Sequence, residues 1–180
     1  RRAGHERSEG GRVARAELRN RLVELEVAFQ RNLNEYRDGI DVTREELDGL
    51  PESYIERLSP GEAEGTYRVS LDYPEVNPYL EQATHRSRRR ELFGKHWSRA
   101  VATNRPLLEE ALEVRRRIAE LVGAPSWAHH AMEVKMARDP GRVAAFYDGL
   151  VPAVRATVPE ELARLAARLR DEGHDGPIQP

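Results

Sequence analysis

Apolar residues recur at three- and four-residue steps over most of this chain, which is the pattern of amphipathic helices. Between residues 12 and 37 they form one stripe, while arginines and glutamates occupy the opposite face. The stripe consists of Leu18, Leu22, Leu25, Phe29 and Leu33. The pattern predicts one long helix that ends at Gly39.

Short elements follow this helix. Thr43 and Glu46 have the spacing of a capping box, which predicts a short helix that Gly49 terminates. Pro51 restarts a helical turn that runs through Leu58.

One segment alternates with a period of two, as a half-buried strand does. In residues 66–71, Tyr67, Val69 and Leu71 share one face, and this is the only convincing strand in the sequence. Residues 59–61 read as a loop. Because a lone strand leaves its backbone groups unpaired, its partner is expected from the residue 61–66 side, from a weaker segment or from sequence outside these 180 residues.

The middle of the chain returns to helical spacing. Residues 73–83 predict an irregular helical turn broken by Pro78, and residues 84–102 predict a helix with Phe93, Trp97 and Val101 in register.

A pair of helices is predicted between residues 104 and 138. Asn104 caps the first and Gly123 stops it, and Pro125 and Ser126 open the second, which ends before Asp139. The apolar positions are Leu107, Leu108, Ala111, Leu112, Ile118, Leu121 and Val122 in the first helix, and Trp127, Ala131, Val134 and Met136 in the second.

The C-terminal third continues as helix. Asp139 and Pro140 are a cap followed by a proline at the first helical position. Pro152 and Pro159 are expected to kink or restart this helix, with Thr157 and Glu160 as a second capping box before it ends near residue 170. The sequence therefore predicts a mainly α fold, a multi-helix scaffold with one small β element.

Composition narrows the class of protein. Charged residues make up 33% of the 180 residues, yet the formal net charge is only -2, so no strong field calls for nucleic acid. The chain has no cysteine, which excludes disulfides and thiolate zinc sites, and it has no apolar run that approaches a membrane span. These features predict a cytoplasmic protein without a membrane partner. The start at Arg1 and the loop-like tail at residues 173–180 predict that both ends are cuts in a longer chain.

The nearest approach to a metal motif is His129, His130 and Glu133. Adjacent histidines point to different helix faces, and Val134 stands where an inverted zinc motif needs its second histidine. We interpret these residues as a solvated helix face beside a packed Trp127. The other histidines, His5, His85, His96 and His174, suggest no cluster.

An arginine run allows three interpretations. Arg86, Arg88, Arg89 and Arg90 are flanked by acids, which favours a solvated helix face over a phosphate or nucleic-acid patch. The third interpretation is that one arginine lines a peptide channel and binds a carboxylate.

Two further residue types invite a catalytic reading that the sequence does not support. The acid pairs Glu109–Glu110 and Glu160–Glu161 are interpreted as first-turn residues at the positive end of helix dipoles. The serines lack the histidine and glycine context of a nucleophile. These serines are Ser53, Ser59, Ser70 and Ser126.

An ordered set of short motifs runs through nearly the whole chain. In the helix pair it comprises Leu112, Arg115, Ala119, Leu121, Gly123, Ala128, Met136 and Ala137. Upstream it comprises Phe29, Asn32 and Leu33, then Gly-Leu-Pro at 49–51 and Leu-Asp-Tyr-Pro at 71–74. In this order, the motifs make the chain resemble the thimet oligopeptidase and oligopeptidase A family of zinc metallopeptidases.

The resemblance implies that residues 1–180 are a helical, non-catalytic portion of a larger two-lobed peptidase, forming scaffold and channel wall. Zinc and a glutamate base would cleave short peptides in the parent enzyme, with no zinc bound by this portion. The implied partners are short peptides and the catalytic portion of the same chain. No catalytic, cofactor-binding or metal-binding residue is carried over, because residues 1–180 lack a histidine-glutamate-x-x-histidine motif. The alternative is a non-catalytic helical protein-interaction module that holds a partner helix.

Overall fold

The computed structural model describes residues 9–174 and 176–178. The positions outside the described residues include Arg1, His5 and part of the tail that was predicted to be a cut loop. The chain divides into two compact units, residues 16–115 and residues 1–15 together with 116–180. Among the described helices, none has both the length and the apolar character needed to cross a membrane.

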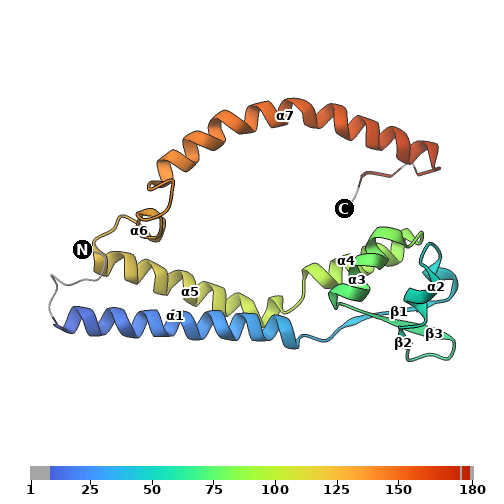
Figure 1. Cartoon of the computed structure of the whole chain (residues 1–180), viewed down its shortest axis with the longest axis horizontal. Helices are drawn as coiled ribbons and strands as arrows, with labels where there is room; N and C mark the ends of the chain where they lie inside the picture. Colours follow the sequence, from blue (N-terminus) through green and yellow to red (C-terminus); the bar gives the residue numbers. More distant parts are fainter. Residues whose placement is uncertain (1–8, 175, 179–180) are drawn as a thin grey trace. The chain divides into compact units, whose positions relative to one another are not determined.

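The described residues are mostly helical, with one small sheet (Figure 1). The mainly α prediction is therefore confirmed. The elements are α1 (Glu9–Glu35), β1 (Gly39–Thr43), the 3₁₀ helix η1 (Glu45–Leu47), α2 (Glu52–Ile55), β2 (Ser59–Pro60), β3 (Thr66–Ser70), α3 (Tyr73–Gln82), α4 (Arg86–Trp97), α5 (Val101–Val122), α6 (Trp127–Met132) and α7 (Pro140–Asp171).

The sheet places the predicted strand in the centre. β3 pairs antiparallel with β1 on one side and with the two-residue β2 on the other. Tyr67 is half-buried, Val69 is fully buried and Leu71 is buried, so the predicted alternation is confirmed. The loop prediction for residues 59–61 is wrong at Ser59 and Pro60, which form β2.

The partner of β3 is β1, a segment in which the sequence placed only a helix end. Gly39 is the first residue of β1, and a Cβ atom there would lie 2.3 Å from the backbone oxygen of Val69. A glycine is thus required by the close approach of the two strands. The helix before it, α1, ends at Glu35.

Short helices close over one face of this sheet and form its core. The predicted capping box is confirmed, because the Thr43 N–H donates to Glu46 Oε2 at 3.0 Å and the Glu46 N–H donates to Thr43 Oγ1 at 3.4 Å. Gly49 follows with a φ of 92°, which fits the predicted stop. The core comprises Ile40, Val42, Leu47, Leu50, Tyr54, Ile55, Leu58, Val69, Leu71, Val76, Tyr79, Ala83 and Leu92.

Helix α3 passes through a proline without a break. Pro78 lies inside the helix, so the predicted interruption at this residue is wrong. Val76 and Tyr79, on either side of it, are fully buried, and the Tyr79 hydroxyl donates to the Glu46 carbonyl at 3.0 Å. This packing offsets the hydrogen bond that a proline removes from a helix.

Helix α4 buries a different face from the one predicted. Leu92 is fully buried and His96 is 6% exposed, whereas Trp97 is 69% exposed and Val101 is 49% exposed. Phe93 is half-buried, and its ring packs against Trp97 with 5.9 Å between centroids. The helix ends at Trp97, before the predicted limit, and α5 begins at Val101.

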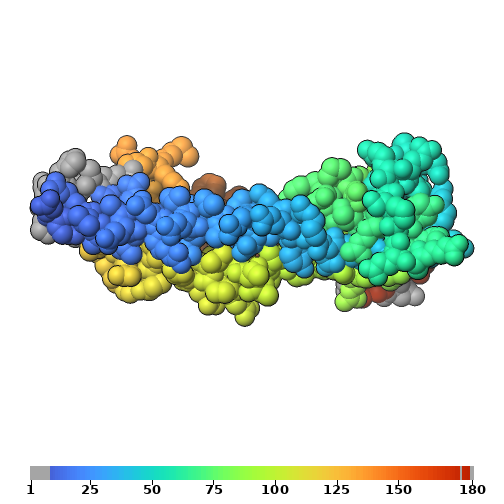
Figure 2. Space-filling view, turned by 90° about the horizontal axis from the view of Figure 1, so that it is seen from below, coloured from blue at the N-terminus to red at the C-terminus, as the bar shows by residue number. Residues whose placement is uncertain are grey.

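Within residues 16–115, α1 and the first half of α5 lie side by side (Figure 2). Asn104 was predicted to cap a helix, but it lies inside α5 and is 4% exposed. Its Nδ2 donates to the Phe29 carbonyl at 3.2 Å, and its Oδ1 accepts from Asn32 Nδ2 at 2.9 Å. Farther along, Arg21 donates to both carboxylate oxygens of Glu110. The partly buried amide pair therefore fixes the register of the two helices.

We expect Asn104→Leu to lower the free energy of unfolding of residues 16–115 by about 1–3 kcal/mol, because Asn32 Nδ2 loses its acceptor in a partly buried site. Combining it with Asn32→Leu should restore most of this loss, since both polar groups then disappear. Urea titrations monitored by hydrogen exchange at β3 amides measure both effects. Gln30→Ala is the control, because it breaks an exposed amide pair with Asn34. Equal losses in the single and double variants would contradict the pairing.

The second unit contains α6 and α7. Gly123 has a φ of 70° and stops α5 as predicted. Ser126 caps α6, but α6 ends at Met132, so the predicted continuation through Val134 and Met136 is wrong, and these side chains are 63% and 98% exposed.

Helix α7 begins as predicted and then continues past both prolines. The Asp139 side chain accepts from the Gly141 N–H at 2.7 Å, and Pro140 opens the helix. Pro152 and Pro159 lie inside one continuous, curved helix (Figure 1), so the predicted restart is wrong. The Thr157 hydroxyl donates to the Val154 carbonyl at 2.9 Å, so it does not form the predicted second capping box.

Candidate functional site

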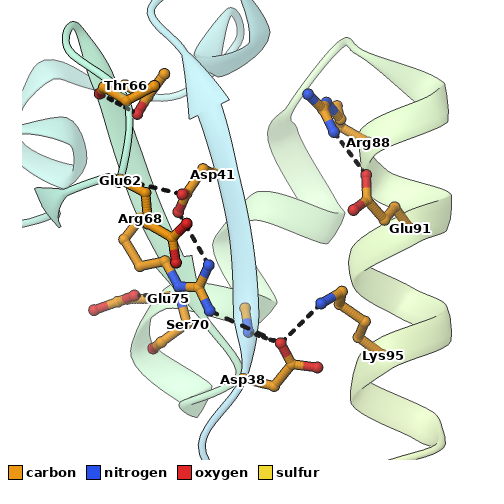
Figure 3. A network of polar contacts seen from close by, with 12 residues as sticks. Asp38, Asp41, Glu62, Thr66, Arg68, Ser70, Glu75, Arg88, Glu91 and Lys95 are labelled. Carbon is orange, nitrogen blue, oxygen red and sulfur yellow. Dashed lines mark hydrogen bonds and ion pairs between the residues drawn. The ribbon is translucent and has the colours of Figure 1, made fainter.

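A cluster of charged side chains surrounds β1 in the first unit (Figure 3). Asp38 Oδ1 accepts from Lys95 Nζ of α4 at 2.8 Å and lies 3.8 Å from Arg68 NH2 of β3. Arg68 NH1 donates to Asp41 Oδ1 at 3.0 Å, and the Glu62 N–H donates to Asp41 Oδ2 at 3.0 Å. Asp41 and Arg68 are directly opposite in the strand register, on the face away from the core.

These contacts hold both aspartates ionised. The hydrogen bond from Lys95 lowers the pKa of Asp38, against a smaller opposing effect of burial. The hydrogen bond from the Glu62 N–H, followed by that from Arg68, lowers the pKa of Asp41. A carboxylate that is held ionised by fixed partners is a poor general acid near neutral pH. The role of this cluster is therefore structural: it attaches β1 to β3 and to α4.

A second set of charges joins η1 to α4. Arg88 Nε donates to Glu46 Oε1, and Arg88 NH1 donates to Glu91 Oε2, both at 2.8 Å. The bond from Arg88 lowers the pKa of Glu46. Next to Glu46, burial raises the pKa of Tyr79 to about 12, with a further contribution from the Glu46 charge. The phenol thus stays protonated and donates to the backbone of η1.

The arginine run is only partly the solvated face that its pattern predicts. Arg88 and Arg89 are half-buried, and Arg89 NH1 donates to the Ala83 carbonyl at 2.8 Å. Arg90 is exposed. Two guanidinium groups are thus engaged with the protein itself, which leaves fewer donors for an anionic ligand.

The two histidines nearest to a metal motif have different neighbours. His129 Nδ1 lies 2.8 Å from Ser126 Oγ, whereas the His130 ring packs against Trp127 with 5.6 Å between centroids. Glu133 is exposed just beyond the end of α6. Within the described ranges, no three histidine, aspartate or glutamate side chains are grouped as a metal site requires. These residues therefore do not fit the zinc that the resemblance implies for the parent enzyme.

Ser126 has a histidine neighbour that the sequence reading did not anticipate. Its Oγ accepts from the His129 N–H at 3.4 Å and contacts the His129 ring, so it serves as the cap of α6. No carboxylate in the described part of the chain is bonded to the His129 ring to orient it as a base.

The acid pairs also lie elsewhere than predicted. Glu110 and Glu160 are several turns inside α5 and α7, not in first turns, because these helices begin at Val101 and Pro140. Each carboxylate forms an ion pair with an arginine, Glu110 with Arg21 and Glu160 with Arg164.

One cluster at the junction of α4 and α5 had only a weak signal in the sequence. His96 is buried, its ring lies 5.8 Å from the centroids of both Tyr73 and Trp97, and its Nε2 lies 2.9 Å from Arg99 NH1. The only hint was the three-residue spacing of His96 and Arg99 across a helix end, and this spacing is common by chance. Tyr73 comes from α3, so only the tertiary fold completes the cluster.

Comparison with known proteins gives consistent relatives. The chain is 28% identical to saccharolysin of Saccharomyces cerevisiae over 153 residues, which cover 82% of this chain and 21% of that protein. It is 26% identical to the thimet-like oligopeptidase of Dictyostelium discoideum over 131 residues, covering 72% and 20%. It is 30% identical to oligopeptidase A of Escherichia coli over 179 residues, covering 91% and 26%. The chain spans a fifth to a quarter of the length of these relatives.

A family model agrees with these relatives. The model of peptidase family M3 matches residues 79–180. This match includes α4, α5, α6 and α7 and thus the helix-pair motifs on which the resemblance was based, while the upstream motifs lie before it. Since it extends over more than half of the 180 residues, the chain belongs to peptidase family M3.

Proposed function

We propose that these 180 residues supply scaffold and channel wall to a zinc-dependent oligopeptidase that cleaves short peptides, and that the zinc site lies in another part of the polypeptide. Membership of peptidase family M3 and relatives named as oligopeptidases support the peptidase activity. The partners in this proposal are short peptides and the catalytic portion of the same polypeptide. We also propose a cytoplasmic location, with which the absence of cysteine is compatible.

One observation carries the assignment of a scaffold role. The side chains that come nearest to catalytic or metal-binding patterns are engaged in local structure, His129 with the cap Ser126 and His130 with Trp127. Among the acids around β1 and η1, Asp38, Asp41 and Glu46 are bonded to arginine, lysine or backbone N–H groups. When bound by the parent enzyme, zinc would polarise a water molecule, and no step of that chemistry is assigned to the residues described above.

The test compares this 180-residue chain with a longer polypeptide that continues into a histidine-glutamate-x-x-histidine helix. We expect the longer polypeptide to hold zinc and to hydrolyse a quenched fluorescent peptide, with loss of turnover when a chelator removes the metal. We expect the 180-residue chain to do neither. Zinc is measured by atomic emission after gel filtration, and turnover by the increase in fluorescence.

The control is the longer polypeptide with the glutamate of that motif changed to glutamine, which should keep zinc and lose turnover. Chelator-sensitive turnover by the 180-residue chain would overturn the scaffold assignment. A folded longer polypeptide that binds zinc and cleaves no peptide would overturn the proposed activity.

A second candidate function is a non-catalytic helical module that binds a partner helix. The exposed apolar side chains along α7 favour it, because a helix face of this kind is normally covered. They include Phe146 (65% exposed), Leu150 (42%), Val154 (51%) and Leu165 (54%). A coding sequence that stops near residue 180 would support the module, and one that continues into a zinc motif would support the enzyme.

A further inference from the structure

The joint between α4 and α5 is short and conformationally demanding. Only Ser98, Arg99 and Ala100 separate the two helices, and Ala100 has a φ of 56° while being 5% exposed. The left-handed region is unfavourable for a residue with a Cβ atom, so neighbouring contacts must hold Ala100 in this conformation. Ser98 Oγ donates to the Gly94 carbonyl at 2.6 Å and secures the α4 side of the joint.

Arg99 provides the main side-chain contact of the joint. Its NH1 donates to the His96 carbonyl at 2.8 Å and lies 2.9 Å from His96 Nε2. Its NH2 lies 3.4 Å from the Tyr73 hydroxyl, and the guanidinium carbon lies 6.0 Å from the centre of the Tyr73 ring. One side chain thus connects the joint to the end of α4 and to the start of α3.

The Arg99 contact defines the protonation state of His96. A guanidinium group has donors only, so Nε2 must present its lone pair and the ring must be neutral with its proton on Nδ1. A proton on Nε2 would place two donors and two positive charges 2.9 Å apart. The contact therefore exists only while His96 is uncharged.

The surroundings of His96 also favour the neutral ring. The charged, titratable and hydrogen-bonding groups that face it are Arg99 from the joint, Tyr73 from α3 and the Leu71 carbonyl from the segment between β3 and α3. The neighbouring Lys95 is bonded to Asp38, and no carboxylate in the described ranges lies within ion-pair distance of the ring. Burial, followed by Arg99, lowers the pKa of His96, and the Leu71 carbonyl acts in the opposite direction.

We propose that His96 and Arg99 form a proton-sensitive clasp, in which protonation of His96 expels Arg99 from Nε2 and loosens the joint between α4 and α5. The direction of the pH dependence follows from the linkage between proton binding and folding. In the unfolded chain, His96 takes up a proton as the pH falls below its ordinary pKa of 6.5. In the folded protein the same protonation requires a lower pH, because the pKa of His96 is lowered there. The clasp is therefore fully stable above pH 6.5 and weakens as the pH falls below it. This property is independent of where the zinc site lies.

The test uses the 180-residue chain across about pH 4.5 to 8, the range of histidine titration. Nuclear magnetic resonance of the ring Cε1–Hε1 groups follows each histidine, and hydrogen exchange follows the amides of residues 98–104 after correction for the intrinsic pH dependence. We expect His96 to titrate below the ordinary histidine value of 6.5, and exchange at the joint to accelerate several-fold in parallel with that titration.

Two variants separate the clasp from general acid unfolding. Arg99→Gln removes the positive charge and should move the His96 titration to higher pH. His96→Gln keeps an acceptor for Arg99 without a titrating group, so joint exchange should become independent of pH over this range. Arg105→Gln, an exposed cation on α5, is the control and should leave the His96 titration unchanged.

Two results would overturn the proposal. The first is a wild-type His96 that titrates at or above the ordinary value of 6.5, and the second is joint exchange that does not follow the His96 titration. Both results are measured on the unmodified chain, so the proposal can be tested even if a variant fails to fold.

Discussion

Leu92→Ala is expected to lower the free energy of unfolding of residues 16–115 by about 2–5 kcal/mol. Leu92 is fully buried in the core beside the sheet, among the largest side chains with no exposed surface. Truncation removes apolar contact and leaves a cavity that short helices and a three-stranded sheet fill poorly. Urea titration monitored by hydrogen exchange at the amides of β1 and β3 measures the change.

The matched control is Trp97→Ala on the same helix. Tryptophan is much larger than leucine, but Trp97 is 69% exposed, so its loss is expected to cost about 1 kcal/mol or less. The two variants distinguish the predicted face of α4, which included Trp97, from the face that the structure buries. A larger loss for Trp97→Ala than for Leu92→Ala would contradict the observed orientation of this helix.

Glu46→Ala is expected to destabilise the same unit by about 2 kcal/mol, because one carboxylate serves two donors in different elements. It accepts from the Thr43 N–H at the end of β1 and from Arg88 of α4. Without it, the N–H group loses its partner and Arg88 keeps only Glu91. Glu45→Ala is the matched control, since this neighbouring glutamate is exposed and its loss should cost less than about 0.5 kcal/mol.

The pH dependence of this effect has a defined sign. The pKa of Glu46 is lowered in the folded protein by Arg88, so its contribution is complete above the ordinary value of 4.5 and is lost as the pH falls through the lowered value. The stability difference between the unmodified chain and Glu46→Ala should therefore shrink in acid below pH 4.5. A difference that stays constant from neutral pH into acid would show that Glu46 acts through packing and not through its charge.

Local sequence signals predicted those features that depend on a few neighbouring residues. The Thr43–Glu46 box, the Gly123 stop and the Asp139–Pro140 start involve residues at most three apart, and all three are confirmed. The divergence of His129 and His130 also follows from helix geometry alone, because neighbouring residues are separated by about 100° on a helix. The structure places these two rings against different partners, Ser126 and Trp127.

Features that depend on distant partners were predicted less well. β1 has five residues, including a glycine and an aspartate, and gains its stability from pairing with β3, which follows it by more than 20 residues. Asn104 is a residue type that favours helix caps, but its partly buried partner Asn32 lies 72 residues away in the sequence. His96 needed Tyr73 from another helix before its environment could be recognised.

The sequence by itself determined the mainly helical class, the central strand and, through the order of its short motifs, the resemblance to the oligopeptidases of family M3. Each of these predictions rests on several positions in the sequence, so an error at a single position does not remove it. The tertiary structure decided which face of α4 is buried, which segment completes the sheet and whether prolines interrupt helices. The physical reason is that burial and strand pairing between distant residues contribute several kcal/mol, while local propensities differ by about 1 kcal/mol or less for most residues.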